Sequence, residues 1–226
     1  LSESLEDSLK KTGANIVFGQ KVNSIIYDDL NKTWRVFTES KNSSFEYSAS
    51  DLIYTPPPQS LLEHLKESLT KKRNYKNRLI NLPHPSGALV FYAALKKEHI
   101  KKIYSNHYQF VSHELGSLFV SISEEGDGRA PKGEITLIAS LFTRTKDWFN
   151  LDKSCYIEKK KDYLKKISLE LENQFNIGSE NWLHKELATP LGFERWTNRP
   201  NGIVGGLGQN PEIFGLFGLS SRTPFK

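Results

Sequence analysis

Three apolar segments followed by a long helical stripe limit most strongly what this chain can fold into. Gly87–Leu95 (GALVFYAAL) is an almost continuous apolar run, and Leu118–Ser123 and Glu134–Thr143 are two further runs of the same kind. Short runs bounded by turn residues are typical of strands. Between about Ser154 and Phe175, apolar residues recur at helical spacing and lysines occupy the opposite face. We therefore expect an α+β fold in which this helix covers a mixed sheet.

The first seventy residues predict a helix, a group of short strands and a second helix. Leu1, Leu5 and Leu9 recur every four residues and Gly13 follows as a C-cap, which predicts a helix over residues 2–12. Alternating apolar residues separated by turn-forming residues predict strands. These strands are expected at 16–18, 22–27, 33–38 and 45–54, and the second helix at 59–68. Later in the chain, a further strand is expected at 181–189.

The last forty residues combine arginines and aromatic residues with a glycine cluster at Gly202, Gly205, Gly206 and Gly208. Glycine lets a backbone take positive φ and approach another surface closely. Arginine can hold an anion or stack on a planar ring. The segment therefore favours a binding site, and a long surface loop is the alternative.

The composition narrows the classes of partner and compartment. The net charge of +5 comes from lysine runs that acidic residues interrupt, which is typical of solvated helix faces. We therefore expect no nucleic-acid partner, and an anionic membrane surface is a minor alternative. The single cysteine, Cys155, excludes an intramolecular disulfide and fits a reducing compartment. Without an N-terminal signal or an apolar run of about 18 residues, a cytoplasmic location is expected.

No catalytic constellation is visible in the sequence, so no catalytic residue is assigned. The six histidines have no metal-ligand spacing, and no metal site is expected. Residues 124–133 (EEGDGRAPKG) predict a wide charged hairpin, whose acids are solvated charges and not a catalytic pair. Neither a GxSxG turn nor a phosphate-binding GxxxxGK is present.

Four segments resemble one family. They are Leu5–Ile26, Ala49–Pro57 (ASDLIYTPP), Leu118–Thr143, and Arg195–Gly206 (RWTNRPNGIVGG) with Arg222–Lys226. Together they are similar to the FAD-dependent carotenoid desaturases and isomerases: phytoene desaturase, carotene isomerase and the cyanobacterial C-3',4' desaturase. The resemblance implies the substrate domain of an FAD/NAD(P)-binding flavoprotein, with part of the flavin domain's outer sheet.

The resemblance also divides the chain. It implies a partial flavin-domain segment at 1–60, a substrate-binding domain at 61–190, and a return segment toward the flavin at 191–226. The chain begins with Leu1, contains no methionine and has no GxGxxG turn for a dinucleotide. We therefore expect an excerpt of a longer protein. FAD would bind the full-length protein, and the excerpt alone would be colourless and inactive.

Site residues follow from the resemblance. Val22 matches the position whose backbone meets the adenine, and Arg195, Gly202 and Gly205 match the segment beside the flavin ring. Asn201, in the same segment, is assigned to the substrate. A flavin would carry the redox chemistry, and the protein would supply a long apolar tunnel. The candidate tunnel walls are Leu89, Phe91, Tyr92, Phe119 and Phe142, with ordinary core packing as the alternative for each.

The leading hypothesis is a carotenoid desaturase or isomerase, with the charged hairpin favouring the C-3',4' desaturase. Its partners would be a carotenoid and, peripherally, a photosynthetic or plasma membrane. Two alternatives stay open. One is another amine-oxidase-like flavin oxidoreductase that acts on a polar amine, and the other is a non-catalytic binding or scaffold module.

Overall fold

The chain forms two compact units. The computed structural model describes residues 2–83, 85–101, 103–207, 213 and 222–225. The smaller unit comprises Leu1–Leu82 with Asn210–Lys226, and the larger unit comprises Pro83–Gln209. The larger unit begins at Pro83 and ends at Gln209, whereas boundaries were expected after residues 60 and 190. Helical residues beyond position 60 pack in the core of the smaller unit, because their leucines contact its sheet.

The larger unit is built on a five-stranded sheet with the order β5-β6-β7-β4-β8, and every pair of neighbours is antiparallel. Strand β4 pairs with β7 along its whole length and with β8 on its other side. The strands are β4 (Gly87–Lys96), β5 (His107–Ser112), β6 (Gly116–Ile122), β7 (Glu134–Thr143) and β8 (Trp182–Ala188). The three strands predicted from the apolar runs are confirmed.

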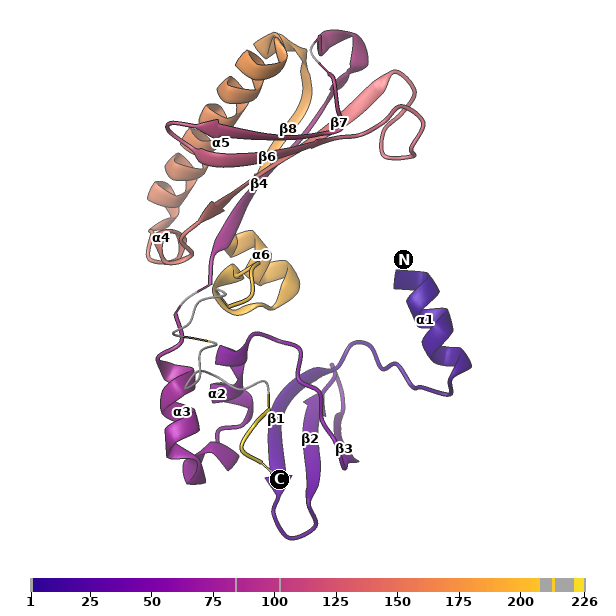
Figure 1. Ribbon diagram of the computed structural model, residues 1–226, viewed down its shortest axis with the longest axis vertical. Coiled ribbons are helices and arrows are strands. Elements are labelled where there is room, and N and C mark those ends of the chain that lie inside the picture. The colour runs from indigo at the N-terminus through magenta and orange to yellow at the C-terminus, as the bar shows by residue number, and fades with distance from the viewer. Residues whose placement is uncertain (1, 84, 102, 208–212, 214–221, 226) are drawn as a thin grey trace. The chain divides into compact units, whose positions relative to one another are not determined.

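One face of this sheet is covered by the long helix α5 (Lys153–Phe175), as Figure 1 shows. Alternate residues of β4 are fully buried against it, beginning with Leu89 and Phe91. The helix contributes Ile167, Leu171 and Phe175 to the same core. The predicted α+β class and the predicted covering helix are therefore confirmed, whereas the sheet, expected to be mixed, has antiparallel pairing between all of its neighbouring strands. The shorter helical elements are η3 (Lys97–His99), α4 (Lys146–Phe149), η4 (Ser179–Asn181), α6 (Pro190–Thr197) and η5 (Pro200–Gly202).

The start of α5 depends on Asp152. Its carboxylate accepts hydrogen bonds from the backbone N–H groups of Ser154 and Cys155, at 2.8 and 2.9 Å. The Ser154 hydroxyl donates a third, and together these bonds hold the pKa of Asp152 well below its ordinary value. Two of the N–H groups that a helix start leaves unpaired are thereby satisfied.

Replacing this cap should give a pH-dependent loss of stability. The lowered pKa means that Asp152 stabilises the folded state above its unfolded pKa of about 3.9, and that this contribution is lost as the pH falls further. We expect Asp152→Ala to lower the free energy of unfolding at pH 7, with Asp152→Asn intermediate. The gap from wild type should narrow below about pH 4. Urea unfolding at pH 7, 5 and 3 measures this, and equal stabilities at pH 7 would contradict it.

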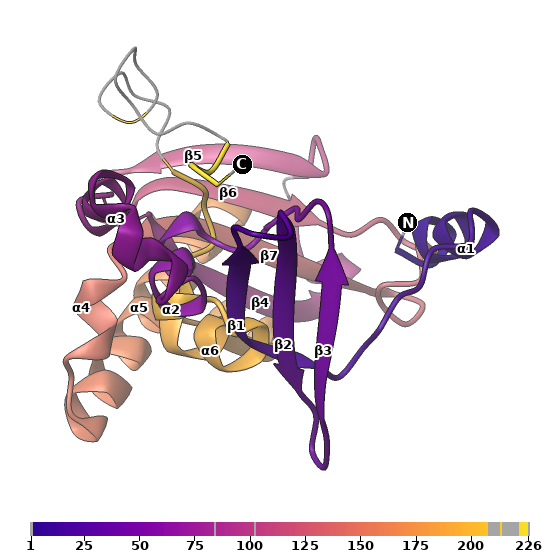
Figure 2. The same ribbon diagram turned by 90° about the horizontal axis from the view of Figure 1, so that it is seen from below.

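The smaller unit joins a three-stranded antiparallel sheet to short helices. Figure 2 shows β1, β2 and β3 side by side in the order of the chain. Ile25, Tyr27 and Trp34 form one side of its core, and leucines of the helices form the other. The elements are α1 (Ser2–Lys11), β1 (Lys21–Asp28), β2 (Thr33–Glu39), β3 (Ser44–Ala49), η1 (Pro58–Ser60), α2 (Leu61–His64), η2 (Ser68–Lys71) and α3 (Arg73–Ile80).

Three predictions for the smaller unit need correction. Residues 16–18 form no strand, and the predicted helix at 59–68 is divided among η1, α2 and the start of η2. The predicted strand to residue 54 ends at Ala49, which pairs with Trp34, the second residue of β2. Because β2 begins one residue earlier, Asp51–Tyr54 has no strand to pair with, and the Ile53 side chain is exposed.

Candidate functional site

The sheet face of the larger unit that points away from α5 carries accessible apolar side chains. This open face is formed by Val90 and Tyr92 of β4, Phe119 of β6, and Ile138 and Phe142 of β7. The exposed fractions of Tyr92, Phe119 and Phe142 are 39%, 46% and 75%. Antiparallel register places Ser140 of β7 between Phe119 of β6 and Val90 of β4, and it places Ile138 beside Tyr92. Three of the predicted tunnel residues therefore share one surface.

The other two predicted tunnel residues lie on the opposite face. Leu89 and Phe91 are 0% exposed in the core beneath α5, and the Phe91 ring packs edge-on against Trp182 at 5.8 Å. Side chains alternate between the faces of a strand, so β4 cannot present both Phe91 and Tyr92 to one ligand. The assignment of Leu89 and Phe91 to a tunnel wall is corrected to core packing.

The aromatic-basic segment near residue 195 forms the helix α6, where the sequence analysis predicted no helix. Pro190 occupies the first turn, and the helix ends at Asn198, which has left-handed backbone angles and donates its N–H to the Glu194 carbonyl. The exposed Arg195 places its guanidinium carbon 5.6 Å from the centre of the Trp196 ring. Exposed Asn201, also left-handed, donates its backbone N–H to the Glu194 carboxylate at 2.8 Å.

The two glycines assigned to the cofactor differ in environment. Gly202 has φ +58°, and an added Cβ would overlap with the Pro190 carbonyl, so packing alone requires glycine there. Gly205 has no positive φ, and an added Cβ would meet nothing nearer than the Ser86 carbonyl oxygen at 3.9 Å. Gly205 and Val204 both direct their backbone N–H groups to that oxygen. The Ser86 carbonyl therefore holds this backbone in place, and the space that a side chain at position 205 would occupy is open.

The remaining predicted flavin contacts lie in the smaller unit or outside the described residues. Val22 is half-buried in β1. Phe225, from the Arg-Thr-Pro-Phe segment, packs in the core of the smaller unit, with its ring centre 5.4 Å from that of Trp34. Gly208, which the sequence placed in the glycine cluster, lies outside the described residues.

A pocket of about 860 Å³ lies in the larger unit between α5, α6 and the strands β4 and β8. This α6 pocket is lined chiefly by Tyr92, Tyr156, Lys160, Glu186, Phe193 and Trp196. The Tyr156 hydroxyl is hydrogen-bonded to that of Thr189 at 2.9 Å, which ties α5 to the strand end that leads into α6. This pocket was not predicted from the sequence. The spacing of Tyr156 and Lys160 one helical turn apart was the available signal, whereas the pairing of Tyr92 with Glu186 depends on strand register.

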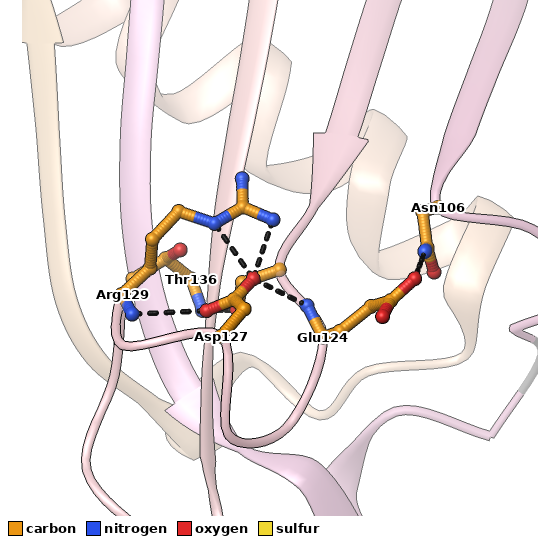
Figure 3. Close-up of polar contacts among 6 residues, drawn as sticks. Asn106, Glu124, Asp127, Arg129 and Thr136 are labelled. Carbon is orange, nitrogen blue, oxygen red and sulfur yellow. Dashed lines mark hydrogen bonds and ion pairs between the residues drawn. The ribbon is translucent and has the colours of Figure 1, made fainter. Parts of the chain in front are cut away.

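The charged hairpin between β6 and β7 is organised around Asp127 (Figure 3). Its carboxylate accepts hydrogen bonds from the backbone N–H groups of Glu124 and Arg129, each at 2.9 Å, and pairs with the Arg129 guanidinium. Glu124 in turn accepts a hydrogen bond from the Asn106 amide. The Asp127 contacts close the predicted hairpin, and the Glu124 contact ties it to Asn106, which precedes β5.

The electrostatics of this hairpin do not suit acid–base chemistry. Hydrogen bonds from Arg129 lower the pKa of Asp127, and Lys97, at 2.8 Å, lowers the pKa of Glu125. Both groups are exposed and stay ionised near neutral pH, so neither holds a proton to donate. Elsewhere, burial raises the pKa of Tyr54 to about 12, and its hydroxyl is hydrogen-bonded to His64 at 2.7 Å. Among the described residues, no group of three or more His, Cys, Asp or Glu side chains is placed to hold a metal ion.

Comparison with known proteins gives a likeness in fold. No family model and no curated protein matches the sequence. Among solved structures, the chain is similar to an oxidoreductase from Methanosarcina mazei, with a TM-score of 0.58 and 13% sequence identity. The match covers 83% of this chain and 41% of that protein, so the chain spans less than half of its length. At this identity the likeness shows a shared α+β fold. No helix in the described ranges is both long and apolar enough to cross a bilayer.

Proposed function

We propose that this chain is part of an FAD-dependent oxidoreductase of carotenoid biosynthesis, which desaturates or isomerises a long polyene. The observation that carries the proposal is the open face, where Tyr92, Phe119 and Phe142 present apolar surface. A polyene has no charge to hold, and burial of apolar area, at about 25 cal/mol per Å², supplies its binding energy. The fold likeness to an oxidoreductase supports the class of reaction.

The residues near α6 fit one edge of a flavin. Arg195 is an exposed cation that could offset negative charge on a reduced ring, and Gly205 leaves open space before a fixed backbone. Bound FAD would supply electron or hydride transfer. Arg195 and Gly205 would then orient the ring edge, while the open face would exclude water from the polyene. Gly202 would act indirectly, because its tight contact with Pro190 fixes the turn.

The same proposal places the enzyme at a membrane surface. Carotenoids partition into lipid, so a photosynthetic or plasma membrane would deliver the substrate to a peripherally associated protein. The C-3',4' desaturation suggested by the hairpin sequence is the specific reaction that we propose.

Variants of the open face test the proposal in the intact protein that contains this chain. Phe119→Asp and Phe142→Asp each place a carboxylate on the surface assigned to the polyene, and both side chains are exposed enough to leave the fold intact. We expect carotenoid turnover at low substrate to fall at least about tenfold, because burying a charge against a hydrocarbon costs more than 1.4 kcal/mol. Product analysis by chromatography measures the effect.

The matched control is Ile157→Asp on α5, a partly exposed apolar residue outside the open face. It should retain full turnover. Unchanged turnover in both phenylalanine variants would contradict a carotenoid on the open face. Oxidation of polar amines in place of carotenoids would favour the amine-oxidase-like alternative.

A further inference from the structure

We propose that the α6 pocket binds an amphiphile with a single anionic head, of the class of long-chain carboxylates. This inference goes beyond the flavin-dependent role. The pocket includes Tyr92 and Arg195, which the proposed function also uses, but the inference rests on Lys160, which that role does not use. The pocket volume of about 860 Å³ falls within the range of about 300–1,000 Å³ that is usual for small-molecule sites. Its walls are mainly aromatic and aliphatic, including Tyr156, Phe193 and Trp196. Trp196 is 80% exposed, which is unusual for so large an apolar side chain.

The charges at the pocket favour an anion. Lys160 and Arg195 both line it, and among the described residues neither pairs with a carboxylate. The pocket is also lined by two acids, each of which has a polar neighbour. Glu194 accepts the backbone N–H of Asn201, and Glu186 lies 3.8 Å from the His184 ring. Lys160 and Arg195 therefore remain able to pair with a bound anion.

Lys160 is the better placed of the two cations. Lys160 is half-buried on α5, one turn after Tyr156, and both residues line the pocket. Arg195 lies on exposed α6, where its guanidinium contacts the Trp196 ring. A ligand carboxylate paired with the Lys160 ammonium would neutralise its charge. The hydrocarbon chain of the same ligand, lying along Tyr156 and Phe193, would cover the apolar wall.

Oleate is the probe, titrated below its micelle-forming concentration into the purified chain by isothermal calorimetry. We expect saturable binding of one oleate per chain. Lys160→Gln should raise Kd about tenfold, the loss expected for one charge-assisted hydrogen bond. Lys160→Arg should bind like wild type. The matched control is Lys161→Gln, an exposed lysine on the same helix that does not line the pocket, and its Kd should stay within about twofold of wild type.

Oleyl alcohol, which has the same chain without the charge, should bind at least about tenfold more weakly than oleate to the wild-type chain. Equal Kd values for Lys160→Gln and wild type would overturn the inference, as would equal affinity for the alcohol. Uptake of many oleate molecules per chain would also overturn it, since that is detergent behaviour. Circular dichroism of each variant confirms that the fold is retained. None of these results bears on carotenoid turnover, so the two proposals fail separately.

Discussion

Gly202→Ala should strongly destabilise the larger unit. Gly202 ends η5 with φ +58°, and its α-carbon lies so close to Pro190 that an added methyl group would overlap with the Pro190 backbone. A non-glycine residue would meet both a strained backbone and a clash with atoms that cannot rotate away. We expect the free energy of unfolding to fall by about 3 kcal/mol or more. Urea unfolding followed by circular dichroism measures this change.

Gly205→Ala provides the control for this prediction. Its new methyl group would lie in ordinary contact with the Ser86 carbonyl, and its backbone angles are open to any residue. The free energy of unfolding should stay within about 0.5 kcal/mol of wild type. If Gly202→Ala were as stable as Gly205→Ala, the turn after α6 would not depend on the contact with Pro190.

Local patterns were sufficient to predict the framework of the larger unit. The apolar runs that became β4, β6 and β7 are bounded by turn residues, and the 23-residue helix α5 buries Ile167, Leu171 and Phe175 at helical spacing. The short strand β5 and the helix α6 are among the elements that escaped prediction. Strand β5 has only six residues, and α6 contains a glycine and begins with proline. In α6 the proline occupies the first turn, where it favours a helix, although a sequence containing Pro and Gly resembles a loop.

The site was less predictable than the framework because it depends on which way side chains point. The run from Ala88 to Ala94 is apolar at every position, so its sequence does not distinguish Phe91 in the core from Tyr92 on the open face. The face of the sheet on which α5 docks determines which of these two side chains is buried. That docking is a tertiary contact, which the local sequence does not specify. In the same way, Glu186 reaches the α6 pocket only because β8 pairs with β4 in one register.

Gly205→Val should abolish carotenoid turnover in the intact protein while leaving the fold in place. Valine at position 205 should not unfold the segment. The space around Gly205 is open, and the backbone N–H groups at Val204 and Gly205 are held by the Ser86 carbonyl in either case. If the flavin ring approaches this backbone, a branched side chain would occupy the position of the ring edge. We expect turnover to fall at least about 100-fold, or about 2.7 kcal/mol in transition-state stabilisation.

Two measurements separate this expectation from the alternative of a surface loop. Urea unfolding should show a free energy close to that of wild type, and flavin absorbance of the purified protein should be reduced or shifted because the ring is displaced. Gly206→Val, at the next residue, is the matched control: Gly206 is exposed and an added Cβ there meets nothing within 4 Å, so turnover should be retained. Full carotenoid conversion by a folded Gly205→Val protein would assign the segment to the surface. Loss of turnover with Gly205→Val but not with Gly206→Val would locate the flavin edge at Gly205, which is half-buried and hydrogen-bonded through its N–H and carbonyl, and not at the exposed Gly206.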